Sequence, residues 1–254
     1  MKNETIVTAI LALLFVMLWL PMGQHDFLID HWMKIGTYAI PFLGIGIFAF
    51  KEAGKSRPLR SDLRFLAVLL LIAYLLHQFE EHWIDLFGNY YAFYTFNNTL
   101  ILENLSQPSG SNGPLTKESI FVINTSLVWL VGLLAIVRSP RHLFPLFAMA
   151  GIVVVNGLVH LLAGIATFRY NPGLLTSIVL FIPLYFWTIK QLHHRIVHYK
   201  IHIIAGLLWA FLAHVIMVAG LLAANWFRIL PEYLFWIVLV LWSMLPLVIL
   251  RKTT

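Results

Sequence analysis

The chain alternates between apolar stretches of about twenty residues and short segments that hold most of its charges, prolines and glycines. About 20 apolar residues in a helix cross the hydrocarbon core of a bilayer, and a helix satisfies its own backbone hydrogen bonds there. The pattern predicts an all-α, polytopic transmembrane helix bundle. The eight predicted spans cover residues 5–22, 34–50, 63–87, 118–138, 142–168, 173–190, 201–224 and 232–250.

Composition supports a membrane location and excludes every kind of site that needs cysteine. The 254 residues are 60% hydrophobic and 11% charged, whereas soluble domains carry about 25% charged residues. The predicted spans leave no room for a separate soluble domain, so residues 1–254 are interpreted as a single membrane domain. The absence of cysteine excludes disulfides, thiolate metal sites, iron–sulfur clusters and a cysteine nucleophile.

The positive charges predict how the chain is oriented. With eight spans and both termini in the cytoplasm, 13 of the 17 lysines and arginines lie on the cytoplasmic side and 4 on the outer side. Such an excess is typical of cytoplasmic loops, so the net charge of +6 is interpreted as a topology signal and not as nucleic-acid binding. The first span could also be the apolar part of a secretory signal. We interpret it as a retained helix because no small-residue cleavage site follows it.

One stretch breaks the apolar pattern at membrane depth: His77-Gln78-Phe79-Glu80-Glu81-His82-Trp83-Ile84-Asp85. A carboxylate near the centre of a membrane helix costs roughly 2.5 to 3.5 kcal/mol. On a regular helix the side chains of His77, Glu80, Glu81 and Asp85 fall within an arc of about 140°, and His82 lies about 60° beyond it. We expect this polar face to point into the bundle, where a partner charge, a cation, protonation or water compensates it.

Polar residues of three other spans lie at a similar predicted depth. Counted at about 1.5 Å per residue, Glu80 and His160 lie about 24 and 26 Å from the inner surface. Asn156 and His214 lie about 20 and 21 Å from that surface, and Asn124 lies about 9 Å below the outer one. Groups from four helices are therefore expected to share one layer in the outer half of the membrane.

The residue types in this layer suit a metal centre. Imidazole and carboxylate side chains supply nitrogen and oxygen ligands for Zn²⁺, Fe²⁺ or Mn²⁺, and the predicted ligands are His77, Glu80, Glu81 and His160. The order His-x-x-Glu reverses the Glu-x-x-His of carboxylate di-metal bundles, and it does not complete the inverted zinc-protease pattern. A metal-free acid–base pair of Glu and His, or a purely structural polar cluster, stays open as an alternative.

Three short elements occur in order along the chain: His77-x-x-Glu80-Glu81, Asn156-x-x-x-His160 and Tyr170-Asn171-Pro172-Gly173. Together they resemble the H-x-x-E-E, N-x-x-x-H and Y-x-P-G elements of the HXXEE-motif family of bacterial membrane proteins. The resemblance covers a core of about residues 70–185 and leaves flanking helical hairpins at 1–60 and 195–254. It implies an integral-membrane enzyme of undefined reaction, with site residues at His77, Glu80, Glu81, Asn156, His160, Tyr170, Pro172 and Gly173.

Two features are expected at the outer end of the layer. Pro172 and Gly173 predict a tight turn that places Tyr170 near the mouth of the site, and a role as a turn alone is the alternative. The outer loop 88–117 begins with an aromatic stretch at residues 90–96. This stretch predicts either an anchor at the membrane interface or a lid over the site.

The function favoured by the sequence is a metal-dependent enzyme in the bacterial inner membrane, with its site facing the outer side. The candidate catalytic residues are Glu80, Glu81, Asn156 and Tyr170, with Asn156 one turn below His160 to orient it or the substrate. The depth of the layer favours an amphiphilic or lipid substrate, with hydrolysis by metal-activated water first and oxidation at a non-haem iron second. The alternatives are a proton- or cation-coupled transporter that uses the same Glu/His layer and a non-catalytic scaffold.

Overall fold

The computed structural model describes residues 25–50, 62–104, 113–139, 141–193, 196 and 199–249, together with isolated positions between 6 and 17. In these residues the regular structure is helical, apart from one bridge between Ile84 and Tyr90. The helices are α3 (Asp26–Phe50), α4 (Leu63–Gln78), η3 (Phe79–Trp83), α5 (Ala92–Asn104), α6 (Lys117–Asn124), η4 (Thr125–Leu130), α7 (Val131–Arg138), α8 (Phe144–Thr167), α9 (Leu174–Thr176), η5 (Ser177–Phe181), α10 (Ile182–His193), α11 (Tyr199–Leu221), η6 (Leu222–Trp226), α12 (Glu232–Met244) and η7 (Leu245–Leu247).

Five continuous helical segments among the described residues are long and apolar enough to cross a membrane. They cover Leu63–Trp83, Lys117–Arg138, Phe144–Thr167, Leu174–His193 and Tyr199–Trp226, and a shorter apolar stretch covers Glu232–Leu247. The predicted all-α membrane bundle is therefore confirmed. The first predicted span, 5–22, falls mostly on residues outside the described ranges. The number of spans and the side on which each terminus lies stay predictions.

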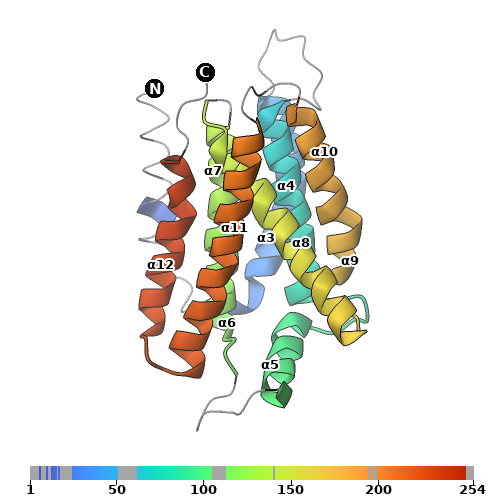
Figure 1. Cartoon of the computed structure of the whole chain (residues 1–254), viewed down its shortest axis with the longest axis vertical. Coiled ribbons are helices and arrows are strands. Elements are labelled where there is room, and N and C mark those ends of the chain that lie inside the picture. Colours follow the sequence, from blue (N-terminus) through green and yellow to red (C-terminus); the bar gives the residue numbers. More distant parts are fainter. Residues whose placement is uncertain are drawn as a thin grey trace.

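Helix α8 crosses the middle of the bundle and packs against α4, α7, α10 and α11 (Figure 1). Every residue from 144 to 154 is buried, as a helix that is apolar on all sides requires. Helices α8 and α11 meet at two glycines, where a Cβ on Gly151 would lie 2.4 Å from the carbonyl oxygen of Gly206. Small residues permit this close backbone approach inside a membrane. The contact holds α11 against the buried first half of α8.

The polar stretch lies on a π-helical turn. Helix α4 continues into η3, and the helix then ends at Ile84, whose backbone is extended. A π-helical turn bonds residues five apart, so the side chains after residue 79 are displaced around the axis relative to a regular α-helix. The predicted span 63–87 was therefore wrong at its end, and Asp85 lies beyond the helix instead of on its polar face. Asp85 closes the following turn, because its Oδ1 accepts hydrogen bonds from the backbone N–H groups of Phe87 and Asn89 at 2.9 and 2.8 Å.

Helix α5 occupies part of the segment predicted as an outer loop. It lies at one end of the bundle, beside the ends of the long helices (Figure 1). The Asn98 side chain holds it, donating to the Leu115 carbonyl at 3.0 Å and accepting from the Leu115 N–H at 3.1 Å. The Tyr91 hydroxyl donates to the carbonyl of Ile29 at 2.8 Å, which ties the start of α5 to α3. The aromatic stretch is thus part of the packed structure.

Candidate metal centre

One carboxylate, that of Glu81, lies among three imidazoles. Its Oε1 is 3.0 Å from His160 Nε2, and its Oε2 is 3.3 Å from the Nε2 atoms of both His77 and His82. These side chains come from α4, η3 and α8, and none of the four residues is more than 4% exposed. His77, Glu81 and His160 offer ligand atoms that all lie within 4.8 Å of one another. The structure thus brings together three of the four predicted ligands.

The ring of His160 is oriented by Asn171. The Asn171 Nδ2 donates to the backbone carbonyl of His160 at 3.0 Å, and a carbonyl can only accept. The other amide atom, Oδ1, therefore faces His160 Nδ1 at 2.7 Å and accepts its proton. With Nδ1 protonated, a neutral imidazole has a bare Nε2, and this atom points at Glu81.

The ring of His77 is oriented in the same sense by Thr176. His77 Nδ1 lies 2.7 Å from Thr176 Oγ1, and this hydroxyl donates its one proton to the Glu80 carboxylate. The hydroxyl oxygen can then only accept from His77, so His77 Nδ1 carries a proton and its Nε2 is bare. Two imidazoles therefore direct bare nitrogens at one carboxylate.

This donor set could hold a divalent metal ion. Ligand atoms about 2.1 Å from a tetrahedral ion lie about 3.4 Å apart. The distances of 3.0 and 3.3 Å from the Glu81 oxygens to the nitrogens of His160 and His77 are close to that separation. Metal-binding histidines typically donate their other N–H to a protein oxygen, as both histidines do here. Because bare nitrogens repel a carboxylate, the arrangement needs a cation or a proton between them.

The adjacent carboxylate, that of Glu80, has different surroundings. Its Oε1 accepts from the Tyr170 hydroxyl at 2.9 Å and the Leu175 N–H at 3.1 Å. Its Oε2 accepts from the N–H of Thr176 at 2.8 Å and from the hydroxyl of the same residue. Burial raises the pKa of the Tyr170 phenol above its usual range, so this hydroxyl stays a donor. Glu80 lies outside the three-residue ligand group and joins α9 to η3, and its predicted role as a ligand stays a prediction.

The turn at residues 170–173 has a steric role as well as a connecting one. Gly173 has a φ of +96°, a left-handed conformation in which side chains are strained. A Cβ there would lie 2.6 Å from His77 Cε1 and 2.7 Å from His160 Cε1. Glycine at this position therefore leaves room for both imidazole rings, whose centroids are 4.9 Å apart.

The order and spacing of these residues match a known family. Residues 68–188 match the model of a family described as proteins of unknown function with an HXXEE motif. This segment belongs to the HXXEE family. The resemblance predicted for about residues 70–185 is confirmed, and the family's description assigns no activity. No curated protein and no solved structure matches the chain.

Within the HXXEE segment, Asn156 contacts His77 and not His160. Its Nδ2 lies 2.9 Å from His77 Nε2, and its Oδ1 lies 3.4 Å from His214 Nε2 on α11. The sequence placed Asn156 as the residue that orients His160 or the substrate, but the side chain that orients His160 is Asn171. Asn171 lies inside the Tyr170–Gly173 element, at its one unspecified position, so the motif itself offered no signal for its role.

A second set of residues in the HXXEE segment joins Asn124, which was predicted in the polar layer, to Gln78 and Trp129, which were not predicted as part of the site. The Trp129 indole donates to Gln78 Oε1 at 2.9 Å, and Gln78 Nε2 donates to Asn124 Oδ1 at 3.0 Å. Asn124 Nδ2 then lies 3.3 Å from His82 Nε2, which is also near Glu81. The π-helical turn explains why His82, outside the polar arc of a regular helix, reaches Glu81. A hydrogen-bond chain thus extends from η4 across α6 to the centre.

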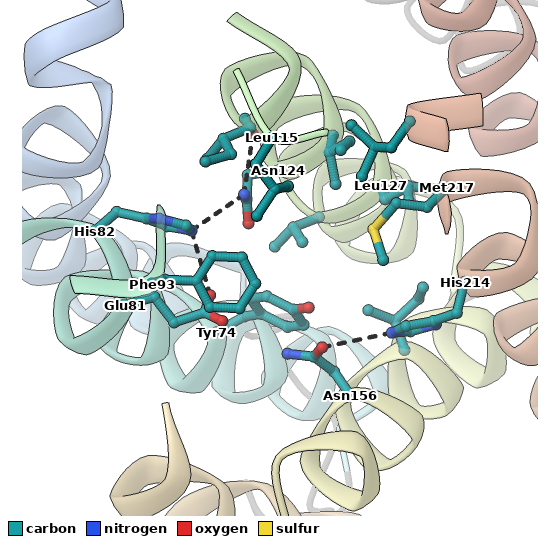
Figure 2. Close-up of a pocket in the computed structure, with 15 residues that line it drawn as sticks. Tyr74, Glu81, His82, Phe93, Leu115, Asn124, Leu127, Asn156, His214 and Met217 are labelled. Atoms are coloured by element: carbon teal, nitrogen blue, oxygen red, sulfur yellow. Dashed lines mark hydrogen bonds and ion pairs between the residues drawn. The ribbon is translucent and has the colours of Figure 1, made fainter. Parts of the chain in front are cut away.

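A small cavity borders the centre (Figure 2). Its volume is about 70 Å³, and the residues with polar groups in its lining are Tyr74, Glu81, His82, Asn124, Asn156 and His214. The expected layer of polar groups from four helices is therefore present. Phe93 of α5 also lines the cavity, with its ring 5.3 Å from that of His82 and 6.1 Å from that of His160. Of the two roles predicted for the aromatic stretch, this contact favours the lid.

Proposed function

We propose that the protein is an integral-membrane, metal-dependent enzyme whose centre is formed by His77, Glu81 and His160. The observation that carries the proposal is the shared orientation of the two imidazoles. Each gives its Nδ1 proton to a fixed oxygen and directs Nε2 at the same buried carboxylate. Catalytic zinc sites typically use three protein ligands and leave a position open to water or substrate. The cavity beside Glu81 supplies space for that position.

Hydrolysis is the reaction that these residues support best. A divalent ion at the centre supplies Lewis-acid chemistry and activates water near neutral pH. The protein's own groups orient the ligands: Asn171 and Thr176 fix the two rings, and Gly173 leaves room for them. Oxidation at a non-haem iron is the second reaction, since two histidines and one carboxylate also suit that ion.

The substrate is proposed to be amphiphilic. The cavity is lined by aliphatic side chains such as those of Ile123, Leu127 and Met217, and by a few polar side chains that include Glu81 and Asn156. Apolar walls with a few placed polar groups are typical of small-molecule sites. A membrane substrate could place an apolar part against these walls and a polar part at the centre. We propose a bacterial inner membrane from the family resemblance, and a site toward the outer side from the distribution of positive charges.

Metal analysis of detergent-purified protein tests the proposal. We expect about one divalent ion per chain in the wild type, and less than a tenth of that in the His77→Ala and Glu81→Ala variants. His25→Ala and Glu103→Gln serve as matched controls, because both residues are exposed, and they should keep the wild-type content. A wild type without stoichiometric metal after purification and reloading with Zn²⁺, Fe²⁺ or Mn²⁺ would contradict the proposal.

Proton- or cation-coupled transport is the second candidate, and one observation favours it. Tyr170, Glu80, Thr176 and His77 form a continuous hydrogen-bonded row from the turn at residue 170 to the centre. Such rows can relay protons in transporters. Protein in proteoliposomes should then show a pH-dependent flux that Thr176→Val abolishes. An enzyme without transport activity would show no flux in either form.

A further inference from the structure

His214 is a histidine of the polar layer that lies outside the three-residue ligand group. It lies on α11, outside the HXXEE segment, and lines the cavity in contact with Asn156 (Figure 2). Its Nδ1 is 2.8 Å from the backbone carbonyl of Ala210, which can only accept, so Nδ1 carries a proton. Apolar surroundings favour the neutral imidazole, in which Nε2 is then a bare acceptor. His214 therefore needs a hydrogen-bond donor at Nε2.

The side-chain amide of Asn156 lies between His214 and His77. One amide atom is 3.4 Å from His214 Nε2, and the other is 2.9 Å from His77 Nε2. The His77 nitrogen is also bare, because Thr176 fixes the proton of that ring on Nδ1. A rotation of the amide by 180° exchanges its nitrogen and its oxygen, but only one of the two imidazoles can face the nitrogen. The other bare nitrogen must face the amide oxygen.

A metal ion at the centre decides which way the amide is turned. A histidine binds a metal through the lone pair of a ring nitrogen, so a metal-bound His77 Nε2 can no longer accept a proton from the amide. The amide nitrogen then donates to His214 Nε2, and the oxygen of Asn156 faces the ion. In this orientation the two imidazoles and both ends of the amide all have partners.

The position of the amide also suits a ligand. Asn156 and His160 are four residues apart on α8, so their side chains lie on one face of the helix. Neighbouring ligands about 2.1 Å from an octahedral ion lie about 3.0 Å apart. The amide atom beside His77 Nε2 is 2.9 Å from it, which is close to that separation. Carbonyl oxygens are ligands for ions such as Mn²⁺, and catalytic Zn²⁺ can expand to five ligands.

We propose that the amide oxygen of Asn156 is a fourth protein ligand of the metal ion, and that His214 is the positioning residue that keeps this oxygen turned toward it. The inference rests on the proposed function for the ion itself. It gives both named residues of the Asn156-x-x-x-His160 element the same role, because each supplies one ligand atom from α8. It also makes α11, which lies outside the HXXEE segment, part of the site.

The affinity of detergent-purified protein for Zn²⁺, measured by competition with a chromophoric chelator, tests this inference. Asn156→Leu keeps the approximate size of the side chain and removes both amide atoms, and it should lower the affinity about 100-fold. Asn156→Asp keeps an oxygen ligand and should stay within about tenfold of the wild type. His214→Leu removes only the acceptor that orients the amide and should lower the affinity about tenfold.

A double variant separates orientation of the ligand from general destabilisation. If His214 acts through Asn156, then His214→Leu should have no further effect on the affinity once Asn156→Leu is present. Two losses that multiply would overturn the positioning role. Tyr74→Phe is the matched control, because the Tyr74 side chain lines the same cavity, and it should keep the wild-type affinity. A fall in Tyr74→Phe equal to that in His214→Leu would also count against the amide as the partner of His214.

The same measurements distinguish this inference from the proposed function. An unchanged or higher affinity for Zn²⁺ in Asn156→Leu would overturn the fourth ligand, because the amide would then donate to His77 and compete with the ion. The metal centre would still stand if His77→Ala loses the ion. A wild type that binds no metal would overturn both.

A second pair of variants keeps the test open if Asn156→Leu does not fold. His214→Gln offers an acceptor oxygen in place of the imidazole nitrogen, so it should recover most of the affinity that His214→Leu loses. Equal losses in the two variants would overturn the role of the acceptor.

Discussion

Glu80 and Glu81 are neighbours in the chain and lie in two different environments. Glu80 is surrounded by hydroxyl and amide donors from Tyr170, Leu175 and Thr176, which satisfy both of its oxygens. Glu81 is surrounded by imidazole nitrogens of His77, His82 and His160. Carboxylates with a full set of fixed donors are satisfied as anions. A carboxylate facing bare nitrogens needs a cation or a proton.

The comparison assigns a structural role and a proposed metal-binding role to two neighbouring residues of one motif. Glu80 connects α9 to η3 and positions Thr176, which in turn orients His77. Glu81 is the group on which the bare nitrogens converge. The second Glu of H-x-x-E-E is thus the proposed ligand, and we propose that the first is a positioning residue.

The largest difference between the two carboxylates is expected in metal binding. Glu81→Gln removes the charged ligand and should lower the affinity for Zn²⁺ by more than about 100-fold, because loss of a ligand exceeds the loss of a residue that only orients one. Competition with a chromophoric chelator measures it. A wild-type affinity for Zn²⁺ in Glu81→Gln would contradict the assignment of Glu81 as the ligand.

Loss of Asn171 is expected to have the next largest effect. Asn171→Ala frees the ring of His160 but removes none of the three ligands. The affinity for Zn²⁺ should therefore fall about 10- to 100-fold, with the stoichiometry unchanged. The same chelator competition applies. Asn97→Ala on α5 is the control, since its side chain bonds only the carbonyl of Phe93 among the described contacts. An equal fall in both variants would indicate general destabilisation.

Glu80→Gln should act on stability more than on metal. The amide would place an N–H group against the donors of residues 170–176, and leaving buried donors unpaired costs roughly 1–3 kcal/mol. We expect a lower melting temperature in detergent and a Zn²⁺ affinity within about tenfold of the wild type. A collapse of metal binding with unchanged stability would reverse the roles of the two carboxylates.

The smallest expected effect lies away from both carboxylates, at Asp30. The Lys117 side chain donates to it at 2.7 Å and holds the pKa of this carboxyl below its usual range. The pair therefore adds stability above the pKa of the unfolded chain, and this is lost as the pH falls through the lowered pKa. Asp30→Asn should be slightly less stable at neutral pH and equal to the wild type in strong acid, as melting curves across that range would show. A gap that persists in acid would assign the effect to something other than the charge.

Part of this arrangement follows from the sequence. The long apolar runs predict the helices, and the depths of Asn156, His160, Glu80 and His214 predict their common layer because the rise of a helix is constant. The roles of Glu80 and His82 could not be predicted in this way. They depend on the π-helical turn at residues 79–83, which changes the direction of each side chain and has no signature in the apolar pattern.

Contacts between residues of separate elements also could not be predicted from the sequence. Asn171 and Thr176 orient histidines that lie 11 and 99 positions away in the chain, and no periodic pattern links such pairs. Gly173 was expected at a turn, but its second reason, the room that two imidazoles need, exists only once α8 and α4 are packed.

X-ray absorption spectroscopy at the edge of the bound metal tests the central claim most directly. The account predicts a first shell with two imidazoles and one carboxylate, and the loss of one imidazole contribution in His160→Ala. A stoichiometric metal whose shell is unchanged in His160→Ala, or which contains no imidazole, would contradict a centre at His77, Glu81 and His160.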